Sequence, residues 1–372
     1  MSSLAQPLNN NQPCADAVLE GGGVRGIGHV GALTVAEEKG YSWVNVAGTS
    51  AGAFVAAMMA AGYSAKEMYS IMRDEVDFSR FAQDKGFNGF FLGETINLLR
   101  RGGLHSGDYI VGFMKEKLGA KQKQKFGDLI VPGREHEPKD SKYRYGLIVI
   151  ASDISTGRML QLPQDALQYG LDPDELDIAL AVRMSASIPF FFIPVDQRNK
   201  KDGRDCRIVD GGLLSNFPVS IFDVQTKPSH PTFGFRLVDS LPTPECPWPI
   251  SPTNNVFQIG QALLSTMLSA HDRLYMDDHT FVRTITVPVN GISGTQFNLS
   301  KEQKDLLYQN GRNAAEQFFS TWNFDEYIAT YRSNLPQEGR RERLHEHMKR
   351  VYQVLETQGP AVKQPSESLT TQ

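Results

Sequence analysis

A serine between two glycines, placed where a strand gives way to a helix, is the residue of this sequence with the clearest chemical use. Residues 43–47 (WVNVA) favour a strand and residues 53–61 (AFVAAMMAA) favour a buried helix, with Gly48-Thr49-Ser50-Ala51-Gly52 between them. The G-x-S-x-G spacing is typical of a nucleophile elbow, whose sharp turn projects the serine hydroxyl and needs glycines to avoid collisions. A helix that begins at Ala51 would also aim its first amides at a developing oxyanion. We therefore predict that Ser50 is a nucleophile for acyl transfer; the alternative is a tight turn with a capping serine.

A run of glycines follows an earlier predicted strand, residues 15–20. Gly21, Gly23 and Gly26 fit G-x-G-x-x-G, and so do Gly26, Gly28 and Gly31, which is the fingerprint of a dinucleotide-binding loop. That fingerprint needs an acidic residue at the end of the second strand, and 45–49 (NVAGT) contains none. A nucleotide- or phosphate-binding regulatory module therefore stays as an alternative. The favoured interpretation is an oxyanion hole built from the amides of 21–23, because parallel strands bring both turns to one sheet edge. Arg25 would hold this loop or add positive charge, unless it is an ordinary surface arginine.

A serine nucleophile needs a base, and the sequence offers two kinds. Asp210 closes a predicted strand, 206–209, and is followed by Gly211 and Gly212, although an Asx turn would look the same. None of the eight histidines has a motif around it. His271 and His279, in or just after a predicted helix, leave open an esterase or acyltransferase with a Ser-His pair.

The three motifs GGGVRG, GTSAG and DGG, in this order and each at a strand end, resemble those of the patatin-like phospholipases. The segment 185–194 (SASIPFFFIP), with Asn216 and Pro218, is similar to that family too, and the resemblance runs from about Ala15 to Trp322. It implies hydrolysis of acyl esters of phospholipids and other lipids by a Ser50–Asp210 dyad, without a cofactor or catalytic metal. The implied oxyanion hole is Gly21, Gly22, Gly23, Val24, Arg25 and Gly26. The implied elbow is Gly48, Thr49, Ala51 and Gly52, and the implied base turn is Gly211 and Gly212.

The elements that must position these residues alternate as strand, glycine turn and helix, which indicates an α/β fold. We expect a three-layer α/β/α domain with a mainly parallel central sheet. Further strands are expected at 145–151, 190–195, 206–209 and 232–238, and helices at 178–187, 256–268 and 301–319. Residues 1–13 are expected to be disordered, 14–322 to form the patatin-like catalytic domain, and 323–372 to form a charged helical extension with a disordered tail.

Composition excludes several classes of protein. The 372 residues carry 38 Lys and Arg against 42 Asp and Glu, a formal net charge of −4, so nothing draws the chain toward nucleic acid. Three cysteines at unrelated spacings make neither a disulfide framework nor a zinc site. We find no pattern of a secretory signal and no apolar run of about 18 residues, so we expect a cytoplasmic protein that can also lie peripherally at membranes.

The expected partner is a phospholipid or other acyl lipid, reached through transient contact with a membrane surface. Residues 86–92 (GFNGFFL) and 95–103 (TINLLRRGG) join an apolar cluster to two arginines between glycines. Such a segment suits an interfacial helix, and a core-facing helix with a basic end is the alternative.

Overall fold

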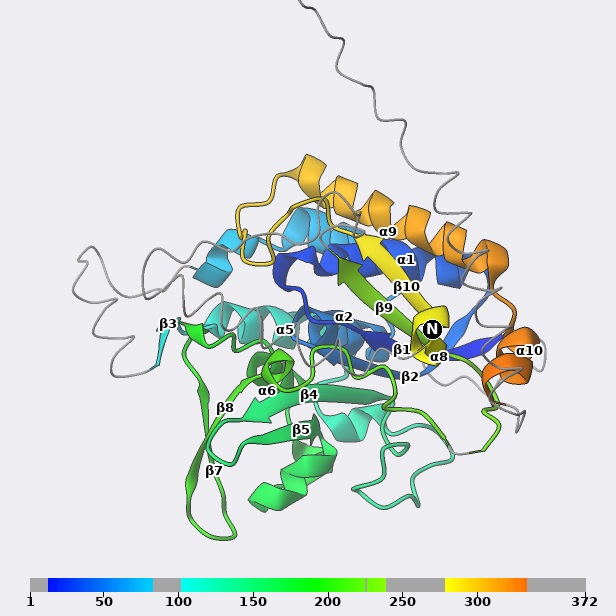
Figure 1. Ribbon diagram of the computed structural model, residues 1–372. Helices are drawn as coiled ribbons and strands as arrows, with labels where there is room; N and C mark the ends of the chain where they lie inside the picture. Colours follow the sequence, from blue (N-terminus) through cyan, green and yellow to red (C-terminus); the bar gives the residue numbers. More distant parts are fainter. Residues whose placement is uncertain (1–12, 83–101, 225, 239–277, 333–372) are drawn as a thin grey trace, which may run out of the picture. The chain divides into compact units, whose positions relative to one another are not determined.

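The structure is a computed structural model that describes residues 13–82, 102–224, 226–238 and 278–332 (Figure 1). The chain divides into two compact units, 1–319 and 320–372. Three predictions fall wholly or largely outside the described residues: the disordered N-terminus, the interfacial segment within 86–103, and the helix at 256–268. Most of the charged extension, from residue 333 onward, lies outside them as well.

Within the described residues of the first unit, eight strands form one mixed sheet in the order β10-β9-β1-β2-β4-β8-β7, with β5 paired to β4. The five strands from β10 to β4 are parallel, whereas β5 and β8 run antiparallel to β4 and β7 runs antiparallel to β8. The strands are β1 (Cys14–Leu19), β2 (Ser42–Thr49), β4 (Leu147–Asp153), β5 (Arg158–Leu162), β7 (Val195–Arg198), β8 (Asp205–Asp210), β9 (Thr232–Val238) and β10 (Thr284–Pro288).

Helices pack against this sheet, α2 on β1, β2 and β4, α6 on β4 and β8, and α1 on β9 and β10. The central strands β1 and β4 are therefore apolar along almost their whole length, as expected of strands covered on both faces. Val18, Ala47, Ile148 and Ile150 pack together with Phe222 in one buried cluster. The predicted α/β fold with a mainly parallel central sheet is confirmed. The helices are α1 (Ile27–Glu38), α2 (Ala51–Ala60), α3 (Ala65–Ser70), α5 (Asp108–Ala120), α6 (Ile178–Ser185), α8 (Asp278–Val282) and α9 (Lys301–Thr321).

Short helical turns connect these elements, and the second unit contains two more helical pieces. The turns are η1 (Gly23–Gly26), η2 (Ile71–Glu75, a π-helical turn), η3 (Phe78–Ala82), η4 (Phe126–Leu129), η5 (Gln164–Tyr169), η6 (Pro173–Glu175) and η7 (Gly211–Leu213). The second unit holds α10 (Phe324–Tyr327) and η8 (Ile328–Arg332).

The single strand predicted at 190–195 is two strands in the structure. β6 (Phe190–Phe192) pairs with β3 (Gly103–His105) in a separate small sheet, and β7 joins the main sheet. Ile193 still donates its amide to the carbonyl of His105, whereas Pro194 has no amide to donate. The pairing therefore changes partner at this proline, as the loss of a backbone donor requires.

The glycines at 28 and 31 allow two helices to approach closely. A Cβ atom on Gly31 would lie 2.0 Å from the carbonyl oxygen of Tyr308 on α9, and one on Gly311 would lie 2.0 Å from that of Gly28 on α1. These helices run side by side in Figure 1. The second G-x-G-x-x-G match thus has a packing role, because only glycine fits where the two backbones meet.

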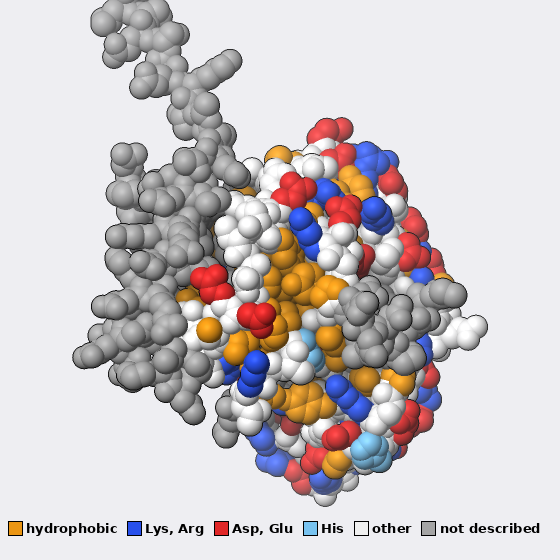
Figure 2. Space-filling model, turned by 90° about the vertical axis from the view of Figure 1, so that its right-hand side faces the viewer, with side chains coloured by type: hydrophobic (Ala, Val, Ile, Leu, Met, Phe, Trp, Pro, Cys, Tyr) orange, Lys and Arg blue, Asp and Glu red, His pale blue; other side chains and the backbone are white. Residues whose placement is uncertain are grey.

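Charged side chains of both signs are interspersed over the face drawn in Figure 2. This mixture agrees with the near-neutral charge of the chain. No helix among the described residues is long and apolar enough to cross a membrane.

Candidate active site

Two strands that meet head-on along β4 bring Ser50 and Asp210 together. β2 runs parallel to β4 and ends with Thr49 opposite Ile150, whereas β8 arrives antiparallel and ends with Asp210 opposite Ala151. Both strands occupy the same edge of β4, because β5 pairs with residues 149–153 along the other edge. Thr49 and Asp210 are therefore paired with consecutive residues of β4, and Ser50, which comes directly after Thr49, lies next to Asp210.

The turn at Ser50 has the strained geometry of a nucleophile elbow. Ser50 has φ 54° and ψ −120°, a conformation that residues other than glycine rarely adopt. A Cβ atom on Gly48 would lie 2.3 Å from the carbonyl of Gly52, and one on Gly52 would lie 2.3 Å from the carbonyl oxygen of Leu19. Both glycines of the motif are therefore required by the close approach of backbone, and α2 begins directly after the serine.

The carboxyl group of Asp210 is buried beside this turn. Burial raises its pKa to about 6, although hydrogen bonds from the Ser50 hydroxyl and the Gly212 amide act in the opposite direction. The Gly212 amide donates to Oδ1 at 2.8 Å. Oδ2 is buried and receives no well-aligned hydrogen bond from the described residues, so it is open to a proton. The position after Asp210 requires a glycine, because a Cβ atom on Gly211 would lie 2.3 Å from the carbonyl oxygen of Ile150.

Several backbone amides of the glycine loop at 21–26 donate to carbonyls of the protein, so they cannot donate to a substrate. Those of Gly21 and Val24 donate to the carbonyls of Asn216 and Gly294, at 3.1 and 3.0 Å. Both the amide and the Nε of Arg25 donate to the carbonyl of Gly22, at 3.3 and 3.1 Å, so this side chain braces the loop.

Of the loop and elbow residues, Gly23, Val24, Ser50 and Ala51 line the cavity at Ser50. Gly23 has φ +58°, and a Cβ there would lie 2.0 Å from the carbonyl oxygen of Gly294. The amides of Gly23 and Ala51 have no hydrogen-bond acceptor within the described chain. A Cβ atom on Gly26 would lie 3.2 Å from the Cβ of Ala51, which is a tight contact.

An apolar cavity opens at Ser50. Apart from Ser50, its lining consists of glycine and hydrophobic residues. These are Gly23, Val24, Ala51, Phe54, Met72, Phe78, Phe81, Ile110, Ala186, Ile188, Phe192 and Phe297. Such a lining suits a hydrocarbon chain, and within the described part of the chain it includes no charged side chain that could pair with a phosphate.

No histidine of the described residues lines the cavity, although the ring of His105 packs against Phe191 and the cavity-lining Phe192. His29 is fully buried, with its Nε2 2.9 Å from the carbonyl oxygen of Glu20, and burial lowers its pKa to about 4. His230 lies near the opposite end of β1, where it contacts Asp16 and Ser229 at 3.2 and 3.0 Å. His271 and the side chain of His279 lie outside the described part of the chain. Within that part, no group of three or more His, Cys, Asp or Glu side chains could hold a metal ion.

The structure adds Ser185 to the neighbourhood of the site. Its hydroxyl accepts a hydrogen bond of 2.8 Å from the Ser50 amide. In the sequence, this serine contributes only to the resemblance of its segment to the patatin-like family. The available signal was the position of this serine near the end of a predicted helix, four residues before Pro189 and ahead of Asp210 in the sequence.

Comparison with known proteins agrees with this geometry. A family model described as patatin-like phospholipase matches residues 17–223, more than half of the chain. The chain belongs to the patatin-like phospholipase family. Protein YqhO of Bacillus subtilis, described as uncharacterized, is 36% identical over 310 residues, which cover 83% of this chain and 99% of YqhO. A probable lipid hydrolase of invertebrate iridescent virus 6 is 27% identical over 204 residues, covering 55% of this chain and 61% of the viral protein.

A solved structure shares the fold of this patatin-like protein. VipD from Legionella pneumophila matches with a TM-score of 0.50 at 18% sequence identity, covering 92% of this chain and 75% of VipD. At this identity the likeness concerns the fold alone.

Proposed function

We propose that this protein hydrolyses carboxylic ester bonds of acyl lipids through an acyl-enzyme on Ser50. The observation that carries the proposal is the position of a strained, buried serine beside a buried carboxyl group, at the mouth of an apolar cavity. Family membership supports a lipid substrate. A phospholipid is the substrate we favour, with its acyl chain in the cavity and its head group outside.

Asp210 acts as the base of the reaction. As Ser50 Oγ attacks the ester carbonyl carbon, the carboxylate takes the hydroxyl proton and then returns it to the departing alcohol. Asp210 next removes a proton from water as the water oxygen attacks the carbonyl carbon of the acyl-enzyme. The bond to Ser50 Oγ then breaks, Asp210 gives this proton to Oγ, and the fatty acid leaves. A pKa near 6 makes this carboxylate a stronger base than an exposed aspartate, yet leaves it ionised at neutral pH.

The amides of Gly23 and Ala51 hold the tetrahedral oxyanion. Among the loop and elbow residues that line the cavity, these two have amides without a protein acceptor within the described residues. Removal of a single such donor costs roughly 3–4 kcal/mol of transition-state stabilisation in a serine protease. Among the six predicted loop residues we therefore favour Gly23 as the donor, together with Ala51 from the elbow.

Ser50→Ala and Asp210→Asn test the proposal directly. Both variants should lose roughly three or more orders of magnitude in fatty-acid release from a defined phospholipid, because dyad members act as a unit. A fluorophosphonate should label wild type covalently and leave Ser50→Ala unlabelled, with unchanged circular dichroism as the control for folding. Substantial labelling of Ser50→Ala, or equal loss in a folded His271→Ala or His279→Ala variant, would overturn the assignment.

A further inference from the structure

One turn of the chain contacts the backbones of both proposed catalytic residues. The end of α6 and the residues after it, Ser185-Ala186-Ser187, lie where β2 and β8 meet. Ser185 Oγ accepts from the Ser50 amide at 2.8 Å, and the Ser187 carbonyl accepts from the Asp210 amide at 2.9 Å. Both serines are fully buried.

A buried arginine fixes this turn to the rest of the domain. The Arg183 guanidinium, 4% exposed, donates to the carbonyls of Ser106 and Ile193 and to the hydroxyl of Ser187. Gly107 makes room for it, since a Cβ there would lie 2.2 Å from Arg183 Nε. The turn is therefore tied to two other segments and cannot follow a movement of Ser50 or Asp210 without breaking buried hydrogen bonds.

The conformation of Ser50 needs such support. A serine at φ 54° lies in a region that costs free energy, and it stays there only when neighbouring groups hold it. The Ser185 hydroxyl also removes the Ser50 amide from the set of possible oxyanion donors. This leaves the amides of Gly23 and Ala51 for that role.

We propose that Ser185 is a positioning residue, whose hydroxyl holds the Ser50 backbone so that its Oγ faces the Asp210 carboxyl group. The inference rests on the proposed function, since it concerns the same serine and aspartate. Ser187 provides a matched control: it is equally buried on the same turn, but its side chain bonds to Arg183 and not to Ser50. Its carbonyl, which contacts Asp210, survives a side-chain change.

The two serines should differ in the pH dependence of their alanine variants. Without the Ser185 hydroxyl, the Ser50 backbone relaxes and its Oγ moves away from Asp210. The hydrogen bond from Ser50 lowers the pKa of Asp210, so its loss raises the midpoint of the acidic limb above the wild-type value of about 6. The plateau rate should fall by about 10- to 100-fold, the scale of a misplacement near 1 Å.

The experiment measures the rate of fluorophosphonate labelling against pH for wild type, Ser185→Ala, Ser185→Cys and Ser187→Ala, and fatty-acid release alongside it. We expect Ser185→Ala to show the lower plateau and the raised midpoint, with Ser187→Ala keeping the wild-type midpoint despite a lower melting temperature. Ser185→Cys keeps the shape but is a weak acceptor, so it should shift in the same direction by less, and it serves if the alanine variant fails to fold.

The inference would be overturned if folded Ser185→Ala or Ser185→Cys kept the labelling rate and the pH midpoint of the wild type. It would also be overturned if Ser187→Ala shifted the pH midpoint as much as Ser185→Ala does. Because labelling needs no lipid substrate, the outcome separates this inference from the proposed function. A wild-type protein that is labelled at Ser50 but releases no fatty acid would contradict lipid hydrolysis and still test the role of Ser185.

Discussion

At the scale of single residues, the burial of Asp210 has a measurable effect on stability. Its pKa of about 6 in the folded protein lies above the ordinary value of 3.8, so the folded state binds this proton more tightly than the unfolded state does. The contribution of Asp210 to stability is therefore most favourable below pH 4. It declines as pH rises from about 4 to 6 and stays unfavourable above that range.

Asp210→Asn should stabilise the protein at pH 8 while it abolishes activity. The amide carries no charge at any pH, which removes the cost of a buried carboxylate, and its oxygen can still accept from the Gly212 amide. Two pKa units correspond to about 3 kcal/mol as an upper bound, so we expect about 1–3 kcal/mol in the free energy of unfolding. Denaturant melts of both proteins at pH 8 and pH 4.5 check this. A difference that does not shrink toward pH 4.5 would show that the carboxylate is not responsible.

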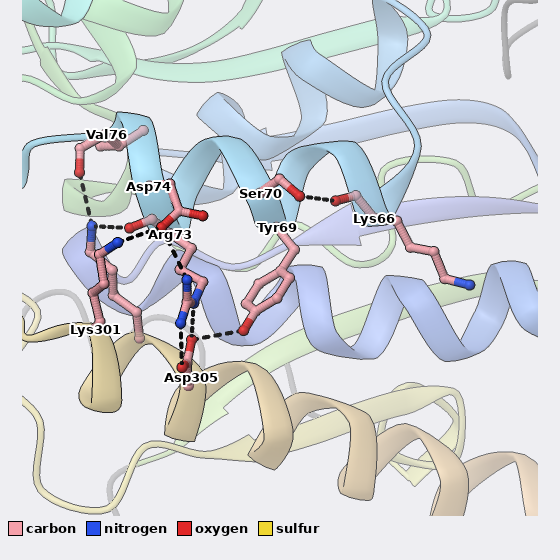
Figure 3. A network of polar contacts seen from close by, with 9 residues as sticks. Lys66, Tyr69, Ser70, Arg73, Asp74, Val76, Lys301 and Asp305 are labelled. Atoms are coloured by element: carbon pink, nitrogen blue, oxygen red, sulfur yellow. Dashed lines mark hydrogen bonds and ion pairs between the residues drawn. The ribbon is translucent and has the colours of Figure 1, made fainter.

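At the scale of elements, α9 holds a wall of the cavity in place. Figure 3 shows Arg73 and Tyr69, from η2 and α3, reaching Asp305 on α9. Arg73 makes two hydrogen bonds to the carboxylate, at 2.6 and 3.1 Å. On the same helix Lys304, 7% exposed, donates to the carbonyls of Arg73 and Val76 at 3.0 and 2.9 Å.

These contacts close the π-helical turn η2, and the cavity-lining Met72, Phe78 and Phe81 lie in or just after it. Lys304→Met would leave two carbonyls without their donor, which costs about 1–3 kcal/mol, and would let this wall move. We expect hydrolysis of long-chain esters to fall several-fold relative to a short-chain ester, together with a lower melting temperature. Lys301→Met is the control: its ammonium group is 60% exposed and pairs with Asp74 at the surface, so both measurements should stay near wild type. Equal losses on both esters in Lys304→Met would show a stabilising role alone.

At the scale of the whole molecule, the described surface presents few sites for contact with lipid. Its exposed large hydrophobic residues are Ile154, Phe190 and Leu306. Phe190 stands out because Ile188 and Phe192, two residues to either side, both line the cavity. It is 50% exposed and has φ +67°, which is unfavourable for an aromatic residue. We expect Phe190 to enter the lipid surface beside the cavity mouth.

Phe190→Asn should lower activity on phospholipid vesicles several-fold and leave hydrolysis of a soluble short-chain ester unchanged. Asparagine tolerates a positive φ, so the fold should not suffer. Ile154→Asn, at a residue with a similar exposed fraction of 48%, is the matched control and should keep both activities. The expectation fails if the two variants lose equally on vesicles, or if Phe190→Asn loses equally on both substrates.

The sequence alone determined the local features of this protein. G-x-S-x-G between a strand and an Ala-rich helix predicted the turn at Ser50, because that composition is what a sharp strand-to-helix reversal needs. Alternation of strands, glycine turns and helices predicted the α/β class, and the three motifs with their order predicted the family. These signals are local, so they can be seen without knowing which segments are neighbours in space.

The tertiary structure decided what depends on neighbours distant in the sequence. Asp210 lies beside Ser50 because β8 pairs antiparallel with the end of β4, directly after the residues of β4 that pair with β2. No pattern within 205–210 specifies the direction in which β8 runs. The two G-x-G-x-x-G matches look alike in the sequence, yet Gly23 faces the cavity while Gly28 and Gly31 meet α9, more than 270 residues further along. The raised pKa of Asp210 and the bond from Ser50 to Ser185 arise from burial and from contact between separate elements, which exist only after the chain has folded.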